Sequence, residues 1–247
     1  MRNYLLFRLY GPMASWGDVA VGEYRPTYGH PSKSAVLGLI GAAVGLQRDD
    51  EAALQALAHA YRFAVRIDNL GNLLRDYHTV QVPPSGTGKN KRRFATRKDE
   101  LAMPKENLNT ILSSRDYRCD ALYTACIWIE QNRPPYTLND LQERLCRPTY
   151  ILYLGRKSCP MSLPLQPQII SAETARQAFL EVKFLDQEDI AYLPSAKTIT
   201  VYWEGINDEG FIKEHSITRR DALLSRKRWQ FADRREHYAS IDNMDKE

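Results

Sequence analysis

The chain has 247 residues, of which 43% are hydrophobic and 26% are charged, and its formal net charge is +4 at pH 7. It is long enough to bury a sizeable core as one large domain or two small ones. Its first residues form no secretory signal peptide, no apolar run reaches the ~20 residues of a membrane span, and its four cysteines form no CxxC pair. We therefore expect a cytoplasmic protein with reduced thiols, no metal or cofactor and no membrane contact.

A strand and a glycine-containing helix open the predicted fold. Residues 4–9 are mostly apolar and end before a Gly-Pro pair, which is typical of a strand. After a loop, Ser32 precedes a long apolar run, as the N-cap of a helix does. Lys33 and Ser34 fall in the first turn, where free N–H groups and the helix dipole favour an anion. A cation does not stabilise a helix start, so we interpret Lys33 as a charge that faces a ligand.

Three glycines interrupt this helix, and each costs about 1 kcal/mol relative to alanine. They are Gly38, Gly41 and Gly45. A sheet, a second backbone or a ligand close to the glycine face would offset that cost. Two compatible interpretations stay open: a buried helix packed tightly on a sheet, and the same packing with a phosphate bound at the helix start.

The elements that follow have the chain order of a ferredoxin-like fold. They are a helix at 51–60, strands at 61–67 and 119–130, a helix at 137–145 and a strand at 149–154, with a further strand candidate at 75–82. Without the segment 82–118, the order is strand, helix, strand, strand, helix, strand. This order predicts an α+β, ferredoxin-like (RRM-like) body over residues 1–165. Residues 121–128 lack the aromatic RNP1 pattern, so we do not expect the sheet-stacking mode of an ordinary RRM.

The inserted segment at residues 82–118 carries the basic excess of the whole chain. It has nine Lys or Arg and four Asp or Glu, a net of +5, so the rest of the chain sums to −1. A loop of this length inside a compact domain is uncommon unless it is functional or disordered. One interpretation is a solvated excursion. The other is a basic thumb whose cations reach the phosphates of a nucleic acid, with Phe94 and Met103 as apolar tips.

The last third of the chain is less regular and predicts a small, mostly-β lobe at residues 166–247. Its predicted elements are a helix at 172–179 and strands at 181–185, 198–203 and 211–218. From Ser225 onward the chain is basic. We interpret this end as a solvated tail, with contact to RNA or another subunit as the alternative.

Four segments, in this order and spacing, resemble one family. They are residues 11–17 (GPMASWG), 34–50, 74–80 (LRDYHTV) and 153–160 (YLGRKSCP). They are similar to the CasD family of the RAMP superfamily, the small subunits of I-E type CRISPR Cascade complexes. The resemblance covers about residues 1–165 and implies an RRM-like body with an inserted thumb. It further implies a subunit that holds the 5′ handle of the guide RNA, caps one end of the complex, and contacts the backbone and large subunits.

The resemblance leaves one enzymatic alternative. Relatives in I-C type systems cut the guide-RNA precursor without a metal, using a Tyr and an adjacent Lys-His pair. This chain has no Lys followed by His, and its best local pair, Tyr77 and His78, would point to opposite faces of a strand. We therefore expect a non-catalytic RNA-binding protein, with metal-independent endoribonuclease activity as the alternative. Target DNA is a further open partner, because phosphates are common to both polymers.

The candidate RNA-binding residues lie at the helix start, on the strand near residue 75, in the inserted segment and in the loop 155–158. Gly155 has no side chain, which would let the backbone approach a phosphate. The full set is Arg25, Lys33, Ser34, Arg75, Tyr77, His78, Lys89, Lys91, Arg92, Arg93, Arg97, Gly155, Arg156, Lys157 and Ser158. We expect no catalytic and no metal-binding residue.

Overall fold

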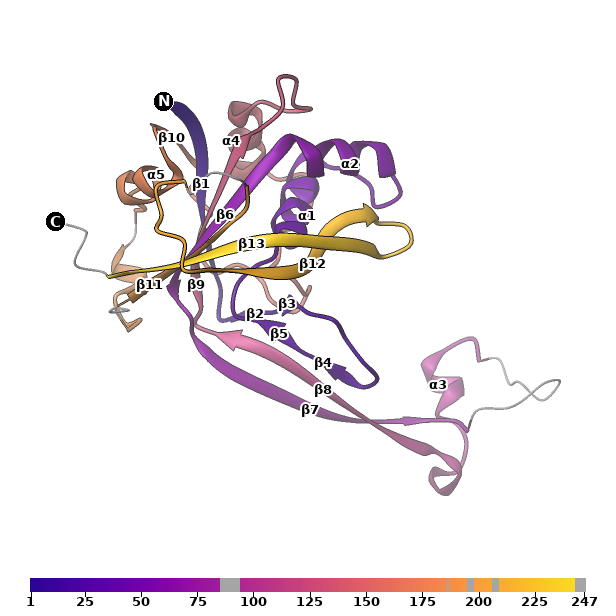
Figure 1. Ribbon diagram of the computed structural model, residues 1–247. Coiled ribbons are helices and arrows are strands. Elements are labelled where there is room, and N and C mark those ends of the chain that lie inside the picture. Colours follow the sequence, from indigo (N-terminus) through magenta and orange to yellow (C-terminus); the bar gives the residue numbers. More distant parts are fainter. Residues whose placement is uncertain (85–93, 186, 195–197, 206–208, 243–247) are drawn as a thin grey trace.

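The computed structural model describes residues 1–84, 94–185, 187–194, 198–205 and 209–242. Its largest feature is a twisted antiparallel sheet, from which a long two-stranded arm extends away from the rest of the fold (Figure 1). None of the helices in the described ranges is long and apolar enough to cross a membrane.

Seven strands form the sheet, in the spatial order β10-β1-β9-β6-β11-β13-β12, and all neighbours are antiparallel. They are β1 (Arg2–Tyr10), β6 (Tyr61–Asn69), β9 (Leu122–Ile129), β10 (Gln168–Ala172), β11 (Thr198–Trp203), β12 (His215–Ser225) and β13 (Gln230–Asp242). The arm consists of β7 (Asn72–Val82) and β8 (Asn109–Cys119). Four two-residue strands complete the set: β2 (Met13–Ala14), β3 (Trp16–Gly17), β4 (Tyr24–Arg25) and β5 (Thr27–Tyr28).

Helices cover both faces of the sheet. On one face lie α1 (Lys33–Val44), α2 (Glu51–Ala60) and α4 (Leu138–Cys146), and on the other lies α5 (Ala175–Glu181). The short α3 (Arg97–Glu100) and the 3₁₀ helix η2 (Lys105–Asn107) belong to the far end of the arm (Figure 1), and a 3₁₀ helix η3 (Gln187–Ile190) follows α5. Successive strand residues point to opposite faces, so Leu5 and Phe7 of β1 join the core under α1, α2 and α4. Tyr4 and Leu6 join a second core, which contains α5. The central strands β1, β6 and β9 are therefore buried on both sides, and the arm extends from them.

The mixed α/β architecture with a large antiparallel sheet confirms the predicted class, but one predicted strand of the body is wrong. Residues 149–154 do not join the sheet, because the N–H groups of Thr149 and Tyr150 donate to carbonyls at the end of α1, those of Ala43 and Ala42. The place beside β1 is taken by β10 instead. An apolar run that looks like a strand thus serves to cap a helix.

The C-terminal strands do not form a sheet of their own. β11 pairs with β6 and β13 pairs with β11, so both halves of the chain build one sheet. The boundary expected near residue 165 therefore coincides with no break in the sheet. The end that we interpreted as a solvated tail is β13, β12 begins at His215, and residues 181–185 are not a strand.

The start of α1 has the N-cap that was expected, but two glycines of the helix are not packed as tightly as expected. Ser32 is the N-cap, and its side chain accepts a hydrogen bond from Ala35 N at 3.1 Å. Gly45 ends the helix in the left-handed conformation, with φ +88°. A Cβ at Gly38 would meet no atom within 4 Å, and one at Gly41 would meet only ordinary side-chain contacts. The tight packing expected along this face is therefore wrong at Gly38 and Gly41.

Two alanine substitutions should change stability in opposite directions. Gly155 lies at φ +85°, and a Cβ there would overlap the carbonyl oxygen of Ser15. Gly155→Ala should therefore lower the free energy of unfolding by about 2–4 kcal/mol, through backbone strain and overpacking. Gly38→Ala should raise it by up to about 1 kcal/mol, because an exposed helix position gains helix propensity without a clash. Urea denaturation measures the free energy of unfolding of both variants. If Gly155→Ala is as stable as the parent chain, the close packing of Gly155 against Ser15 is contradicted.

Candidate nucleic-acid interface

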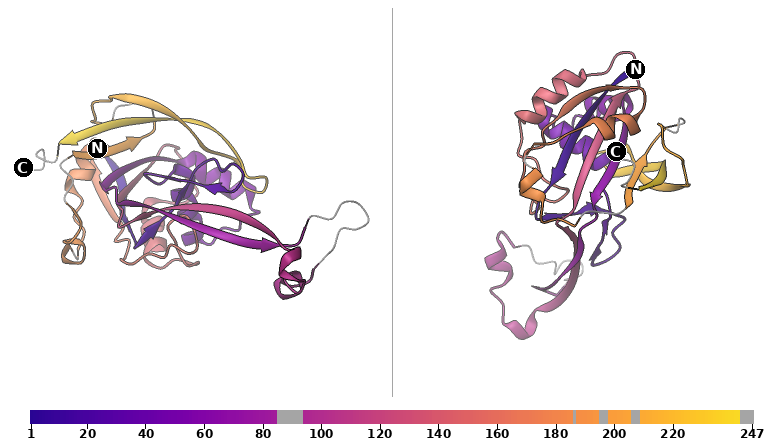
Figure 2. Two further views of the ribbon diagram at one scale, coloured as in Figure 1. Left: turned by 90° about the horizontal axis from the view of Figure 1, so that it is seen from below. Right: turned by 90° about the vertical axis from the view of Figure 1, so that its left-hand side faces the viewer.

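The arm is a continuous β-hairpin and not a structureless loop. β7 and β8 pair without a break from Asn72 opposite Cys119 to Val82 opposite Asn109, so the inward-facing backbone groups of each strand are satisfied by the other. The arm therefore begins at Asn72, ten residues earlier than the expected insertion at 82. Both views of Figure 2 show it projecting from the sheet. Among the described residues, the arm pairs with the rest of the fold at its root, through β2 and β4.

Large side chains are exposed on both faces of the arm. Leu73 and Tyr77 lie on one face and Leu74 and Val80 on the other, because neighbours on a strand alternate. Tyr77 is 61% exposed. A two-stranded hairpin has no core of its own and is marginally stable alone. The arm thus offers aromatic and apolar surface on both sides to a binding partner.

Charged and aromatic side chains from three strands meet at the root of the arm. Arg75 on β7 pairs with Asp116 on β8, with 2.8 Å between Nε and Oδ1. The Tyr24 hydroxyl on β4 donates to the same carboxylate at 2.5 Å, and the Arg75 guanidinium lies over the Tyr24 ring. The hydrogen bond from Arg75 lowers the pKa of Asp116. The carboxylate therefore stays ionised and holds both partners in place.

Arg156 reaches this root from the loop that follows Leu154. Its guanidinium donates to the backbone carbonyl of Arg25 at 3.1 Å and to that of Asp116 at 3.4 Å, and it lies 4.9 Å from the centre of the Tyr117 ring. Three of the predicted arginine positions, far apart in sequence, are thus brought together at the root: Arg25, Arg75 and Arg156.

The rest of the loop 155–158 has a different role from the one expected. The missing side chain of Gly155 makes room for the carbonyl group of Ser15 and not for a phosphate. The Ser15 N–H in turn donates to the Leu154 carbonyl at 3.0 Å, which fixes the loop to the N-terminal segment. Lys157 and Ser158 remain exposed on this fixed loop.

The start of α1 lies inside the protein, which corrects the expected role of Lys33. Its side chain is buried, and its Nζ lies 2.6 Å from Oε1 of Glu204. The anion predicted at the helix start is supplied by the chain itself, because Asp221 on β12 accepts a hydrogen bond from the Lys33 N–H at 2.9 Å. The Ser34 hydroxyl lies 3.0 Å from that of Ser32. Lys33 therefore does not face a ligand.

The remaining candidates lie along the arm. Tyr77 and His78 point to opposite faces of β7, and His78 pairs with Asp76. Arg97, at the start of α3, pairs with Glu100 and donates to a carbonyl of β7. Four candidates lie outside the described residues: Lys89, Lys91, Arg92 and Arg93.

A buried charge network beside α1 is the main feature that sequence reasoning missed. Its members come from the approach to α1, from α1 itself and from the C-terminal strands: His30, Lys33, Glu204, Arg219, Asp221, Arg234 and Glu236. Arg234 lies at its centre, 2.7 Å from Asp221 and 2.6 Å from Glu236. The only signal in the sequence was the short runs of mixed charge on β12 and β13, and such runs are also typical of a solvated strand.

The network carries no net charge when His30 is neutral. Burial lowers the pKa of His30, which favours the uncharged ring. Burial alone would raise the pKa of Glu236, but a hydrogen bond from His30 and the charges of Arg234 and Arg219 lower it below its ordinary value. Three cations then face three carboxylates. The network thus ties the β12–β13 hairpin to the start of α1.

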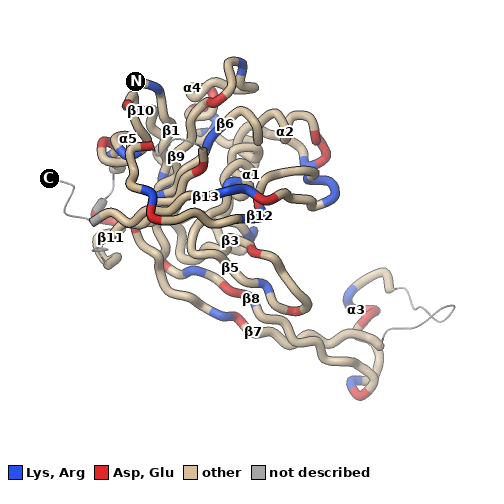
Figure 3. Tube along the Cα trace, in the orientation of Figure 1, with Lys and Arg blue, Asp and Glu red and all other residues tan. Residues whose placement is uncertain are grey.

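Charge is distributed unevenly over the described part of the chain. On both strands of the arm the acidic and basic residues lie next to each other near the root, whereas basic residues gather at the β12–β13 turn (Figure 3). This turn contains Arg226, Lys227 and Arg228. Within the described ranges, no group of three or more His, Cys, Asp or Glu side chains could hold a metal ion.

These features define a mixed α/β protein with a large antiparallel sheet and a projecting β-arm. A family model described as "CRISPR-associated protein (Cas_Cas5)" matches residues 4–236. The chain therefore belongs to the Cas5 family of CRISPR-associated proteins.

Individual relatives agree with this assignment. The chain is 37% identical over 188 residues to the CRISPR system Cascade subunit CasD of Escherichia coli (strain K12), which covers 73% of this chain and 77% of that protein. A chain of a solved "CRISPR RNA-guided surveillance complex" is similar in fold, with a TM-score of 0.65 at 23% identity, covering 97% of this chain and 90% of that chain. A second structure, "Crystal structure of Cas protein", has a TM-score of 0.59 at 23% identity, covering 98% and 96%. The family resemblance inferred from four short segments is thus confirmed.

Proposed function

We propose that this chain is a non-catalytic, guide-RNA-binding subunit of a CRISPR antiviral surveillance ribonucleoprotein of the Cascade type. In this role it holds the 5′ handle of the guide RNA, caps one end of the complex in the cytoplasm, and contacts the backbone and large subunits. Membership of the Cas5 family and the similarity to CasD support the role. The observation that carries it is the exposed hairpin, whose root gathers Arg25, Arg75 and Arg156.

We further propose that the arm is inserted in a ferredoxin-like, RRM-like body. β1, α1, β6, β9, α4 and β10 follow one another along the chain as strand, helix, strand, strand, helix, strand, and their strands lie in the order β10-β1-β9-β6. The arm connects β6 to β9, the two strands that such a fold joins by a hairpin. The body then includes β10 and reaches past residue 165, and the later strands extend its sheet.

The arm suits a single-stranded RNA for two reasons. Tyr77 offers an exposed ring on which a base can stack, and such stacking tolerates any sequence. Exposed cations such as Lys98 on α3 and Arg115 on β8 can bind phosphates of the RNA backbone. Arg75 keeps a partly exposed guanidinium at the root while Asp116 fixes its direction. Target DNA is a second polymer that the same cations could bind, and family likeness favours the guide RNA.

RNA that co-purifies with the protein tests this function directly. The complex that contains this chain should retain RNAs that share a short 5′ sequence, because the proposed role is to hold one constant end of every guide. Sequencing the bound RNA from the native complex measures this. Recovery of RNAs with unrelated 5′ ends, or of no RNA, would contradict the proposal.

The purified chain should not cut repeat RNA in the presence of EDTA. Tyr77 and His78 point to opposite faces of β7 and His78 is paired with Asp76, so the two cannot act together on one phosphate. Gel analysis of end-labelled repeat RNA measures cleavage. Site-specific cleavage that is abolished by Tyr77→Phe or His78→Ala would favour the endoribonuclease alternative instead.

A further inference from the structure

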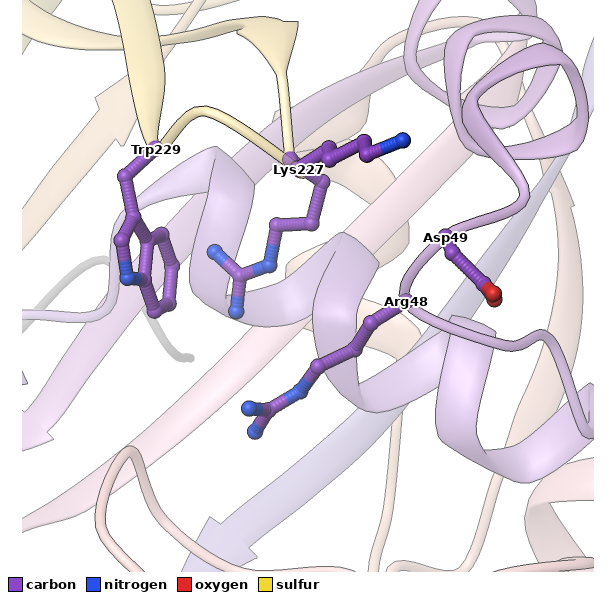
Figure 4. A pocket seen from close by; sticks show the side chains of 5 residues that line it. Arg48, Asp49, Lys227 and Trp229 are labelled. Carbon is purple, nitrogen blue, oxygen red and sulfur yellow. The ribbon is translucent and has the colours of Figure 1, made fainter.

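A basic pocket lies between the α1–α2 connection and the β12–β13 turn. Its volume is about 280 Å³, and it is lined by Arg48, Asp49, Arg226, Lys227 and Trp229. In Figure 4 the Arg48 side chain reaches toward the side on which Trp229 lies, whereas the Lys227 amine and the Asp49 carboxylate point away. No residue of the arm lines this pocket.

Two guanidinium groups line the pocket, those of Arg48 and Arg226. Within the described part of the chain, no carboxylate forms an ion pair with Arg48 or Arg226. Glu51 on α2 is already occupied, because it accepts hydrogen bonds from the Lys227 N–H at 2.6 Å and from the Ser225 hydroxyl at 3.3 Å. Burial lowers the pKa of Arg226, and the charge of Arg48 lowers it further. Like charges held close without a counter-charge leave room for an anion from outside.

Trp229 gives this anion site an aromatic wall. The Arg226 guanidinium lies 3.8 Å from the centre of its ring, yet 61% of the residue is exposed. Its backbone is in the left-handed region at φ +52°, an uncommon position for a bulky residue. The turn is also fixed in place, since the Gln55 side chain on α2 donates to the Leu224 carbonyl at 2.5 Å. An exposed indole is thus held in a defined position beside two unneutralised cations.

We propose that this pocket binds one nucleotide of a single-stranded RNA, with its phosphate between Arg48 and Arg226 and its base on the free face of Trp229. A cationic pair beside an exposed ring matches both parts of a nucleotide, whereas an acidic protein segment would use only the cations. The pocket deepens the proposed function and rests on it, because it adds an RNA contact separate from the arm. The buried network around Arg234 holds the hairpin that carries Trp229.

Fluorescence of Trp229 reports occupancy of this pocket. The other three tryptophans, Trp16, Trp128 and Trp203, are at most 2% exposed, so acrylamide should quench mainly Trp229. Adding a short oligoadenylate RNA to the full-length chain at low salt should protect this fluorescence from acrylamide. Trp229→Phe should remove the quenchable signal and so identify its source.

Charge variants then test the phosphate contact. Arg48→Gln and Arg226→Gln should each abolish the protection and flatten the slope of log affinity against log salt by about 0.7, the value for one phosphate on a single strand. Arg235→Gln removes the same charge from an exposed position on β13 and should leave both readouts unchanged. Circular dichroism confirms that each variant is folded.

Three outcomes would overturn the proposal, and each has a different meaning. If labelled RNA binds the chain but acrylamide still quenches Trp229 to the same extent, the pocket is not an RNA site. The arm alone would then support the proposed function. If polyglutamate protects Trp229 and RNA does not, the pocket docks an acidic protein segment. If RNA does not bind the chain at all, the proposed function fails together with the pocket.

Discussion

Arg234→Met should lower the free energy of unfolding by about 3–5 kcal/mol, because it breaks a buried ion-pair network. Arg234 is buried and pairs with Asp221 at 2.7 Å and with Glu236 at 2.6 Å. Its removal leaves three buried carboxylates facing Lys33 and Arg219 alone. A buried charge without its partner loses hydration and gains little in return, so the cost exceeds that of the lost hydrogen bonds.

The neighbouring residue provides the matched control. Arg235 is exposed on the same strand, and Arg235→Met should change stability by no more than about 0.5 kcal/mol. Urea denaturation followed by circular dichroism measures both variants. Equal stabilities would mean that the network is open to water and does not hold the hairpin.

The network also links stability to the proposed RNA contacts. β12 and β13 carry Arg219, Asp221, Arg234 and Glu236, and their turn carries the pocket residues Arg226 and Trp229. Since Asp221 caps the start of α1, the turn is held against the helical face of the sheet by buried ion pairs at its base. A rigid base keeps the exposed Trp229 in one position, which lowers the entropy cost of binding.

Local patterns predicted those parts of the fold that depend on neighbours in sequence. Ser32 caps α1 because its side chain needs only the N–H group of Ala35. Strand β6 follows from the alternation at 61–67, since one face must be apolar to join the core. The family was also recognisable, because four short segments kept their order and spacing.

Three of the failures have one physical cause, which is that a partner far away in the sequence decides the outcome. Lys33 has a side chain that would suit a phosphate, and only the fold places Glu204 and Asp221 beside it. Gly155 leaves space beside its backbone that would suit a phosphate. Only the fold shows that the Ser15 carbonyl occupies this space. Residues 149–154 have the composition of a strand, yet their backbone caps α1.

Removing the outer part of the arm should weaken RNA binding more than any point substitution. Val80 and Ile111 are opposite each other on β7 and β8, so an Asn-Gly turn can replace residues 81–110 without touching the root. The deletion removes seven Lys or Arg and three Asp or Glu, a net of +4. Each lost phosphate contact should flatten the slope of log affinity against log salt by about 0.7, and three such contacts amount to about two.

A second variant distinguishes the loss of the arm from a loss of net positive charge elsewhere on the protein. Replacing Arg133, Arg144 and Arg147 with Gln lowers the net charge by three at exposed positions outside the arm. This variant should keep the slope of the parent chain, since long-range charge contributes little beyond the Debye length at physiological salt. The arm deletion should retain its melting temperature, because β7 and β8 still pair with each other and with β2 and β4 at the root.

The salt dependence of guide-RNA binding by the parent chain and by these two variants tests the central claim most directly. We predict that the arm deletion flattens the slope by at least about two and weakens binding at every salt concentration, whereas the triple Arg variant matches the parent. Identical slopes and affinities for the arm deletion and the parent would contradict the claim that the outer part of this hairpin binds the guide RNA.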